Sequence, residues 1–90
     1  MAYIIKTTGE VIETKPKNGT DFSLEELNEV VGGYIEVISL HDGRLIVCDE
    51  EGKLKGKDRN HKATEFFRLT LLTTDFLVGD VLVCNEEEIK

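Results

Sequence analysis

The residues with the clearest chemical potential lie in one cationic segment, positions 53–62. The chain has eleven basic residues against eighteen acidic ones, and five of those eleven fall within these ten positions. In an extended backbone the lysines at positions 53, 55 and 57 would point the same way and form a comb about 13 Å long. The segment also leads into a predicted helix N-terminus, where free N–H groups favour an anion. It is therefore a candidate site for a phosphate, a nucleotide or an acidic protein surface, with these binding residues: Lys53, Lys55, Lys57, Arg59, Asn60 and Lys62.

The same segment is also compatible with a solvated connection whose lysines offset the acids at positions 49–51. It lacks the spacing of a phosphate-binding loop, and no exposed aromatic ring alternates with the lysines, as sequence-neutral binding of single strands usually requires. The net charge of −7 opposes attraction to nucleic acid or to an anionic membrane and favours basic partners. We therefore expect neither nucleic acid nor a membrane as a partner.

A second candidate is a pair of acidic residues, Glu36 and Asp49, in a hairpin predicted around the turn dipeptide Asp42-Gly43. A two-residue turn at this dipeptide places the two carboxylates opposite each other. Like charges in this position destabilise a hairpin, so the pair needs a nearby cation, or it is an acid/base pair with separated pKa values. A register that differs by one or two residues, or exposure at the open end of the hairpin, would leave the two residues unrelated.

Histidine and cysteine form no recognisable metal site. The four possible ligands are His41, Cys48, His61 and Cys84, and the first two lie about 13 Å apart along the predicted hairpin, too far for a common ion. Each cysteine follows an apolar run, "LIV" or "VLV", as small buried strand residues do, so we expect two free thiols in a reducing compartment. The sequence predicts no metal, no cofactor and no specific catalytic residue.

The first half of the chain contains signals for a hairpin and a helix. Residues 2–7 and 10–14 are rich in β-branched side chains and flank Thr8-Gly9, so they predict a hairpin in which Ile5 faces Ile12. A capping box of Ser23 and Glu26 then begins a helix with apolar positions at helical spacing. Glycines at positions 32 and 33 end it.

The second half predicts a hairpin, a shorter helix and a last strand. The hairpin at positions 34–49 is apolar on both faces, which favours a central place in the sheet. Asn60 or Asp58 is a possible N-cap for a helix that runs to about Leu69 and buries Ala63, Phe66 and Phe67. Residues 80–84 form the last strand, and 85–90 form a frayed acidic tail. Residues 1–90 therefore make a single α+β domain of order ββαββαβ, a mainly antiparallel sheet with two short helices packed against it.

From about Gly33 to Cys84 the chain resembles a family of small domains of unknown function, the DUF3846 type. Four groups of residues carry the resemblance: Gly33, Ile35 and Glu36; Asp49-Glu50-Glu51-Gly52; Asn60, Ala63 and Thr64; Val78-Gly79-Asp80. The connection "KLKGKDRN" departs from the family in being less apolar. The resemblance implies a genomic setting, in phages and mobile elements of gut Firmicutes and Bacteroidetes, and it implies no particular reaction.

These observations favour a non-enzymatic binding protein of a phage or mobile element, which inhibits a host defence system by binding a host protein. Its acids at positions 25–29, 49–51 and 86–88 would present a carboxylate surface, or they only keep the protein soluble. The alternative is a small-molecule binder that sequesters a nucleotide signal with the cationic segment. A hydrolase that uses Glu36 and Asp49 is a third possibility. Because the start lacks a secretion signal and no apolar run could span a membrane, we expect a cytoplasmic protein, a monomer or a small homo-oligomer.

Overall fold

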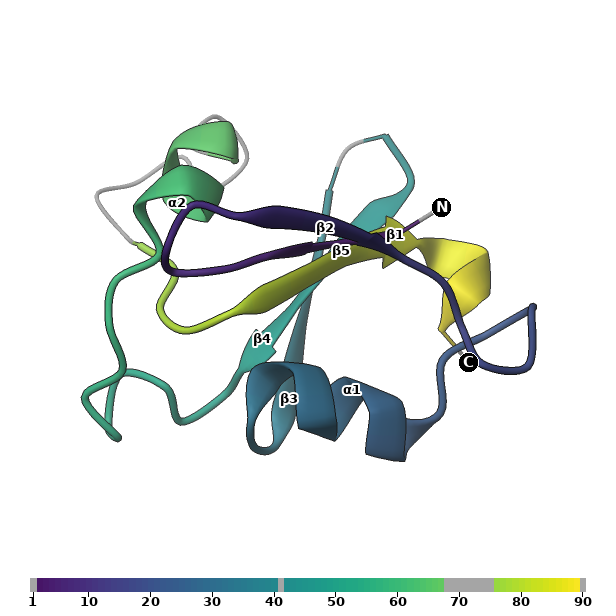
Figure 1. Ribbon diagram of the computed structural model, residues 1–90, viewed down its shortest axis with the longest axis horizontal. Helices are drawn as coiled ribbons and strands as arrows, with labels where there is room; N and C mark the ends of the chain where they lie inside the picture. Colours follow the sequence, from purple (N-terminus) through teal and green to yellow (C-terminus); the bar gives the residue numbers. More distant parts are fainter. Residues whose placement is uncertain (1, 41, 68–75, 90) are drawn as a thin grey trace.

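The protein is built around one antiparallel sheet of five strands, as a computed structural model of residues 2–40, 42–67 and 76–89 describes it (Figure 1). The strands lie in the order β2-β1-β5-β4-β3, and every neighbouring pair is antiparallel. This confirms the predicted α+β class and the order ββαββαβ, to which the structure adds a short 3-10 helix, η1. The element bounds are β1 Ala2–Ile5, β2 Val11–Thr14, α1 Leu24–Val31, β3 Ile35–Ser39, β4 Arg44–Asp49, α2 His61–Phe66, β5 Val81–Asn85 and η1 Glu86–Glu88.

The two helices pack on opposite faces of the sheet (Figure 1). Leu27 and Val31 of α1 belong to one core cluster together with Val47 and Leu82 from the central strands. On the other face, the residues around α2 form a second cluster with Ile46 and its neighbours. The central strands β4 and β5 are buried on both faces, which explains their uninterrupted apolar runs. None of the helices in the described part of the chain is long and apolar enough to cross a membrane.

Helix α1 begins and ends where the sequence predicts. The Ser23 side chain accepts a hydrogen bond from the Glu26 amide, and the Glu26 carboxylate accepts one from the Ser23 amide, so the capping box is complete. Phe22, the residue before the cap, packs in the same cluster as Leu27. Gly32 ends the helix with φ of 78°, a left-handed conformation that favours glycine.

Helix α2 begins after the predicted cap, Asn60, but its buried face differs from the prediction. Ala63 and Phe67 are buried, whereas Phe66 is 67% exposed. Ala63 and Phe67 are four residues apart and lie on the same side of the helix, toward the sheet, whereas Phe66 lies beside that face and is exposed. The predicted end near Leu69 lies outside the described residues.

Both predicted hairpin registers are wrong by one residue, for the same reason. Ile5 pairs with Val11 instead of Ile12, and Glu36 pairs with Cys48 instead of Asp49. Each loop has three residues between its last paired positions, where a two-residue turn was expected: 6 pairs with 10, and 40 pairs with 44. The last residue of each loop is a glycine with positive φ, 93° at position 9 and 86° at position 43. This is the arrangement of a three-residue hairpin loop with a left-handed third residue.

The second hairpin and the tail also depart from expectation. Strand β3 lies at the edge of the sheet, so only β4 of the predicted central hairpin is central. Residues 85–89 of the tail that was expected to be frayed are held against the domain, because η1 includes residues 86–88 and the Phe22 amide donates to the Glu88 carbonyl oxygen over 2.7 Å. Ile89 forms a parallel bridge with Phe22 and packs partly buried against the α1-side core.

Candidate binding site

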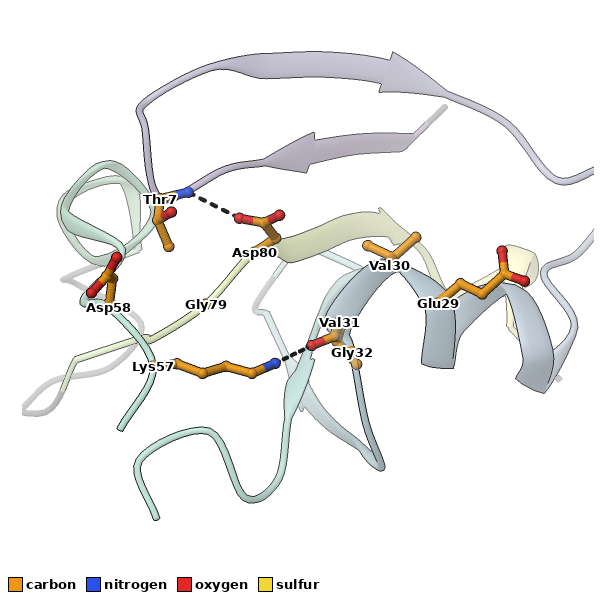
Figure 2. Close-up of a pocket in the computed structure, with 9 residues that line it drawn as sticks. All are labelled: Thr7, Glu29, Val30, Val31, Gly32, Lys57, Asp58, Gly79 and Asp80. Atoms are coloured by element: carbon orange, nitrogen blue, oxygen red, sulfur yellow. Dashed lines mark hydrogen bonds between the residues drawn. The ribbon is translucent and has the colours of Figure 1, made fainter. Parts of the chain in front are cut away.

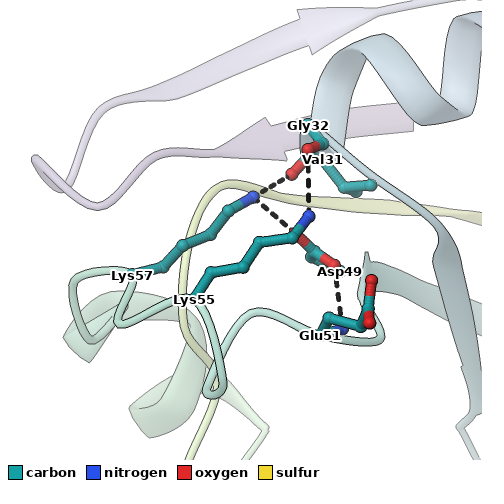
Figure 3. Close-up of polar contacts among 6 residues, drawn as sticks. All are labelled: Val31, Gly32, Asp49, Glu51, Lys55 and Lys57. Atoms are coloured by element: carbon teal, nitrogen blue, oxygen red, sulfur yellow. Dashed lines mark hydrogen bonds and ion pairs between the residues drawn. The ribbon is translucent and has the colours of Figure 1, made fainter.

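The cationic segment is fastened to a buried carboxylate at the end of β4 (Figure 3). Asp49 is 5% exposed, and its Oδ2 lies 2.8 Å from Lys57 Nζ and 3.0 Å from Lys55 Nζ. Its Oδ1 accepts a hydrogen bond of 2.9 Å from the Glu51 amide. We call Asp49, Lys55 and Lys57 the Asp49 cluster.

The two lysines of the Asp49 cluster also donate hydrogen bonds to carbonyl groups at the C-terminus of α1. Lys57 Nζ donates to the Val31 carbonyl oxygen, and Lys55 Nζ donates to the Gly32 carbonyl oxygen over 3.4 Å (Figure 3). The last turn of α1 contains no basic residue of its own. Cations at a helix C-terminus are favoured by the free carbonyl groups and the helix dipole. The distant loop therefore supplies the charge that the helix lacks.

Glycines leave the space that the Asp49 cluster occupies. A Cβ atom added at Gly33 would collide with Lys55 Nζ and lie about 3 Å from both carboxylate oxygens of Asp49. A Cβ atom at Gly79, where φ is 72°, would lie 2.9 Å from Lys57 Cδ. These two glycines leave room for the lysine side chains that pass over them.

The surroundings of Asp49 hold it in the ionised state. Burial raises the pKa of its carboxyl group, but hydrogen bonds from Lys57, Lys55 and the Glu51 amide outweigh this effect and lower the pKa from 3.8 to about 2. The charge is therefore paired at every pH at which the protein would ordinarily be found.

The lysine comb predicted for the segment is absent, because the backbone is folded into turns instead of extended. The Lys55 amide bonds to the Glu51 carbonyl oxygen over 2.9 Å, and the Gly56 amide bonds to the Lys53 carbonyl oxygen over 3.2 Å. Gly56 has φ of 71°, which favours glycine in such a turn. The turns direct Lys55 and Lys57 inward, toward Asp49.

The other predicted cations also contact the protein itself. Lys53 Nζ and Arg59 Cζ lie 4.6 Å and 4.0 Å from the centre of the Phe76 ring, within cation–π range. Lys62 Nζ donates to the Gly9 carbonyl oxygen over 3.1 Å. The six residues proposed for anion binding are thus divided among several contacts and do not converge on one point.

Asn60 is completely buried and ties three segments together. Its Oδ1 caps α2 by accepting from the Ala63 amide, and its Nδ2 donates to the carbonyl oxygens of Ile5, over 2.8 Å, and Gly79, over 2.9 Å. The Thr64 hydroxyl donates to the Asn60 carbonyl oxygen. This side chain uses its donors and its acceptor inside the fold, so its contacts are structural. The sequence revealed the cap, but the other partners lie 55 and 19 residues away.

Glu36 and Asp49 do not form an acidic pair. In the observed register Glu36 lies opposite Cys48, so its side chain is on the α2 face, whereas Asp49 is one residue further and on the α1 face. Glu36 is exposed, and its Oε1 lies 4.0 Å from Cys48 Sγ. Both cysteines are buried free thiols, which confirms that prediction. Within the described residues, no three His, Cys, Asp or Glu side chains are grouped closely enough to hold a metal ion.

A concavity of about 380 Å³ opens beside the Asp49 cluster, between the C-terminal half of α1 and the segments around positions 58 and 80 (Figure 2). Three carboxylates line it, Glu29, Asp58 and Asp80, together with the stem of Lys57. Asp80 Oδ1 accepts from the Thr7 amide over 3.1 Å, which fixes one of the three. Sequence reasoning did not group these acids, because 29, 58 and 80 belong to separate elements.

The fold and site together define a small α+β domain whose cationic loop is fastened to a buried carboxylate. The chain matches the family model described as Domain of unknown function (DUF3846) over residues 1–90, and it belongs to this family. The match extends the resemblance from the second half to the whole chain. No curated protein and no solved structure matches it. Four residues that carry the resemblance have a place in these contacts. Asp49 belongs to the Asp49 cluster, Gly33 and Gly79 lie beneath its lysines, and Asn60 makes the buried hydrogen bonds described above.

Proposed function

We propose that the domain is a non-enzymatic binding protein that occupies a basic surface of a host protein. The observation that carries this proposal is the concavity lined by three carboxylates, beside a lysine that is already paired with Asp49. Among the described residues, Glu29, Asp58 and Asp80 form no ion pair, whereas Lys57 Nζ is held by Asp49 and by the end of α1.

A basic side chain of a partner suits this concavity in size and charge. The acidic groups of the concavity come from different elements, with Glu29 at the α1 rim and Asp58 and Asp80 on the other side, so an arginine at its mouth has carboxylates on both sides (Figure 2). Charge-assisted hydrogen bonds to carboxylates are stronger than neutral ones. An anionic ligand in the same place would be repelled by the same groups. The net charge of −7 adds long-range attraction for a basic partner.

The setting implied by the family supports a more specific role. A phage or mobile-element protein of this size and charge can act in the cytoplasm of the host cell by covering a basic surface, such as the nucleic-acid-binding face of a defence protein. We propose this inhibitory role for the domain.

Capture of a partner from host lysate tests the proposal. The wild-type protein should recover a stoichiometric host protein, and a variant with Glu29→Gln, Asp58→Asn and Asp80→Asn should recover at least tenfold less. A variant with Glu13→Gln, Glu25→Gln and Glu87→Gln changes the net charge equally but leaves the concavity intact, so it should bind nearly as the wild type does. Failure to recover a partner at concentrations well above micromolar, or equal losses in the two variants, would contradict the proposal.

A second function, binding of an anionic small molecule such as a nucleotide, is favoured by a different observation. Lys53 and Arg59 converge on one ring, Phe76, where they could contact a phosphate together. A ligand in large excess must raise the melting temperature if it binds the folded state. A panel of nucleotides should then include one that stabilises the wild type and not the Arg59→Gln variant. The absence of a shift for any nucleotide would exclude this function for the compounds in the panel.

A further inference from the structure

The outer edge of β3 carries backbone groups that the sheet leaves unused. Hydrogen bonds from Leu40 N to Arg44 O and from Glu50 N to Tyr34 O mark the two ends of the β3–β4 ladder. Hydrogen-bonded pairs alternate along an antiparallel ladder, so the even-numbered residues of β3 bond to β4 and the odd-numbered residues direct their N–H and C=O groups outward. The outward residues are Ile35, Val37 and Ser39. No described residue bonds to these six groups, and β3 ends the sheet.

This edge lacks most of the features that usually prevent strands from pairing between molecules. Natural edge strands are often protected by charged residues, above all lysine, by proline or by a bulge, and β3, with the sequence IEVIS, has only one of these, the charge of Glu36. Val37 is 42% exposed and Tyr34, just before the strand, is 72% exposed, which adds apolar surface. The opposite edge, β2, has only four residues and is followed by Lys15-Pro16.

We propose that the edge of β3 binds a second copy of this chain, with the two β3 strands antiparallel about a twofold axis at Val37. In this register Val37 lies opposite Val37 of the partner subunit, and Ile35 lies opposite Ser39 of the partner subunit. Each of the three pairs can exchange two backbone hydrogen bonds, so all six outward groups are used. The two sheets then join into one sheet of ten strands, with both copies of α1 on the same face.

The position of Glu36 favours this register over its neighbours. About an axis at Val37, Glu36 faces Ile38 of the partner subunit, and no like charges meet. An axis at Glu36 would place two carboxylates directly opposite each other, which is unfavourable. An axis at Ile38 would leave Ile35 without a strand partner. A strand pair of five residues is only about 17 Å long, so we expect a reversible dimer that depends on concentration.

Sedimentation equilibrium between about 5 and about 500 µM tests the proposal, over a range that spans weak protein association. The average mass should rise from 10.1 kDa toward twice that value. Val37→Glu places two carboxylates across the axis and should weaken the dimer at least tenfold. Val11→Glu is the matched control, because Val11 is 44% exposed on the other edge strand, and it should dimerise as the wild type does.

Two results would overturn the proposal. A protein that stays monomeric at every concentration would exclude the second copy and leave the edge to an extended segment of a different protein. Loss of the dimer in Val11→Glu, with a normal dimer in Val37→Glu, would place the contact at β2.

A disulfide trap tests the register itself and also detects a weak dimer. Cα atoms of a hydrogen-bonded pair lie about 5.5 Å apart, within the range for a disulfide, so Val37→Cys should form a covalent dimer in an oxidising buffer. In Ser39→Cys the two new thiols lie four residues apart along the strand pair, about 14 Å, and should not link. Ser39 is exposed and pairs with Leu45, and the native cysteines are buried, so the assay stays readable. A Val37→Cys protein that is folded by circular dichroism but does not link, or links no faster than Ser39→Cys, would contradict the proposal.

Discussion

The substitution Asp49→Asn tests whether the Asp49 cluster stabilises the fold. The variant keeps the shape of the side chain and leaves Lys55 and Lys57 without their counter-ion. The pKa of Asp49 is lowered from 3.8 to about 2, and at about 1.4 kcal/mol per pH unit this corresponds to a contribution of about 2 kcal/mol to the free energy of unfolding. For a domain of this size the melting temperature at pH 7 should fall by about 8–16 °C.

The stability difference between the wild type and Asp49→Asn should depend on pH, in a direction set by the lowered pKa of Asp49. Because the pKa of Asp49 is lower in the folded state than in the unfolded state, the contribution is complete above about pH 5 and is lost as the pH falls toward 2. Urea unfolding at several pH values should therefore show a stability difference between wild type and Asp49→Asn that closes over this interval. The reasoning would be refuted by a variant that matches the wild type at pH 7, or by a difference that remains unchanged at pH 2.

A matched control separates the cluster from the change in net charge. Glu36→Gln removes one negative charge from an exposed residue of the neighbouring strand and should change stability by less than about 0.5 kcal/mol. A double-mutant cycle of Asp49→Asn with Lys57→Met should give a coupling energy of about 1 kcal/mol or more, as expected for contacting charges. Equal effects of Asp49→Asn and Glu36→Gln would show that the loss of stability comes from the change in net charge and not from the Asp49 cluster.

Three further predictions follow from the glycines, the buried asparagine and the thiols. Gly79→Ala and Gly56→Ala impose the same left-handed strain of about 1 kcal/mol, but only the first crowds a lysine stem, so by urea unfolding it should cost about 1 kcal/mol more; equal costs would contradict this. Asn60→Asp keeps the helix cap but turns a carboxylate oxygen toward two carbonyl oxygens, and should cost about 3 kcal/mol or prevent folding at pH 7; a stable variant would show that these bonds are dispensable. Burial, with a smaller effect of a nearby carboxylate, raises the pKa of Cys84 to about 11, so Cys84 and Cys48 should react with a thiol reagent only as fast as the protein unfolds; rapid labelling of the native protein would refute it.

Local signals in the sequence were sufficient to locate most elements. The capping box at Ser23, the stop at Gly32 and the cap at Asn60 each depend on neighbours within four residues, and all three are present. The hairpin registers were not predictable in the same way. Two-residue and three-residue loops have nearly the same composition, and the difference of one residue moves every side chain to the other face.

The candidate site was less predictable than the fold because its partners are distant along the chain. The spacing of the lysines drew attention to positions 53–62, but it gave no information about which groups these lysines contact. Lys57 finds its partners 8 and 26 residues away, at Asp49 and Val31. The sequence contained one indication of this site, the pair of glycines at 32 and 33, where other side chains approach the backbone closely.

The central position of β5 has a consequence for synthesis on the ribosome. This strand bonds to both β1 and β4, yet it is made after both of them. At about 5–20 residues per second, the 32 residues from Glu50 to Val81 take roughly 2–6 seconds to add. During this time the two hairpins can form but cannot join, and the inner edges of β1 and β4 stay unpaired. The nascent chain therefore depends on β5 to join the two hairpins into one sheet and to cover their open inner edges.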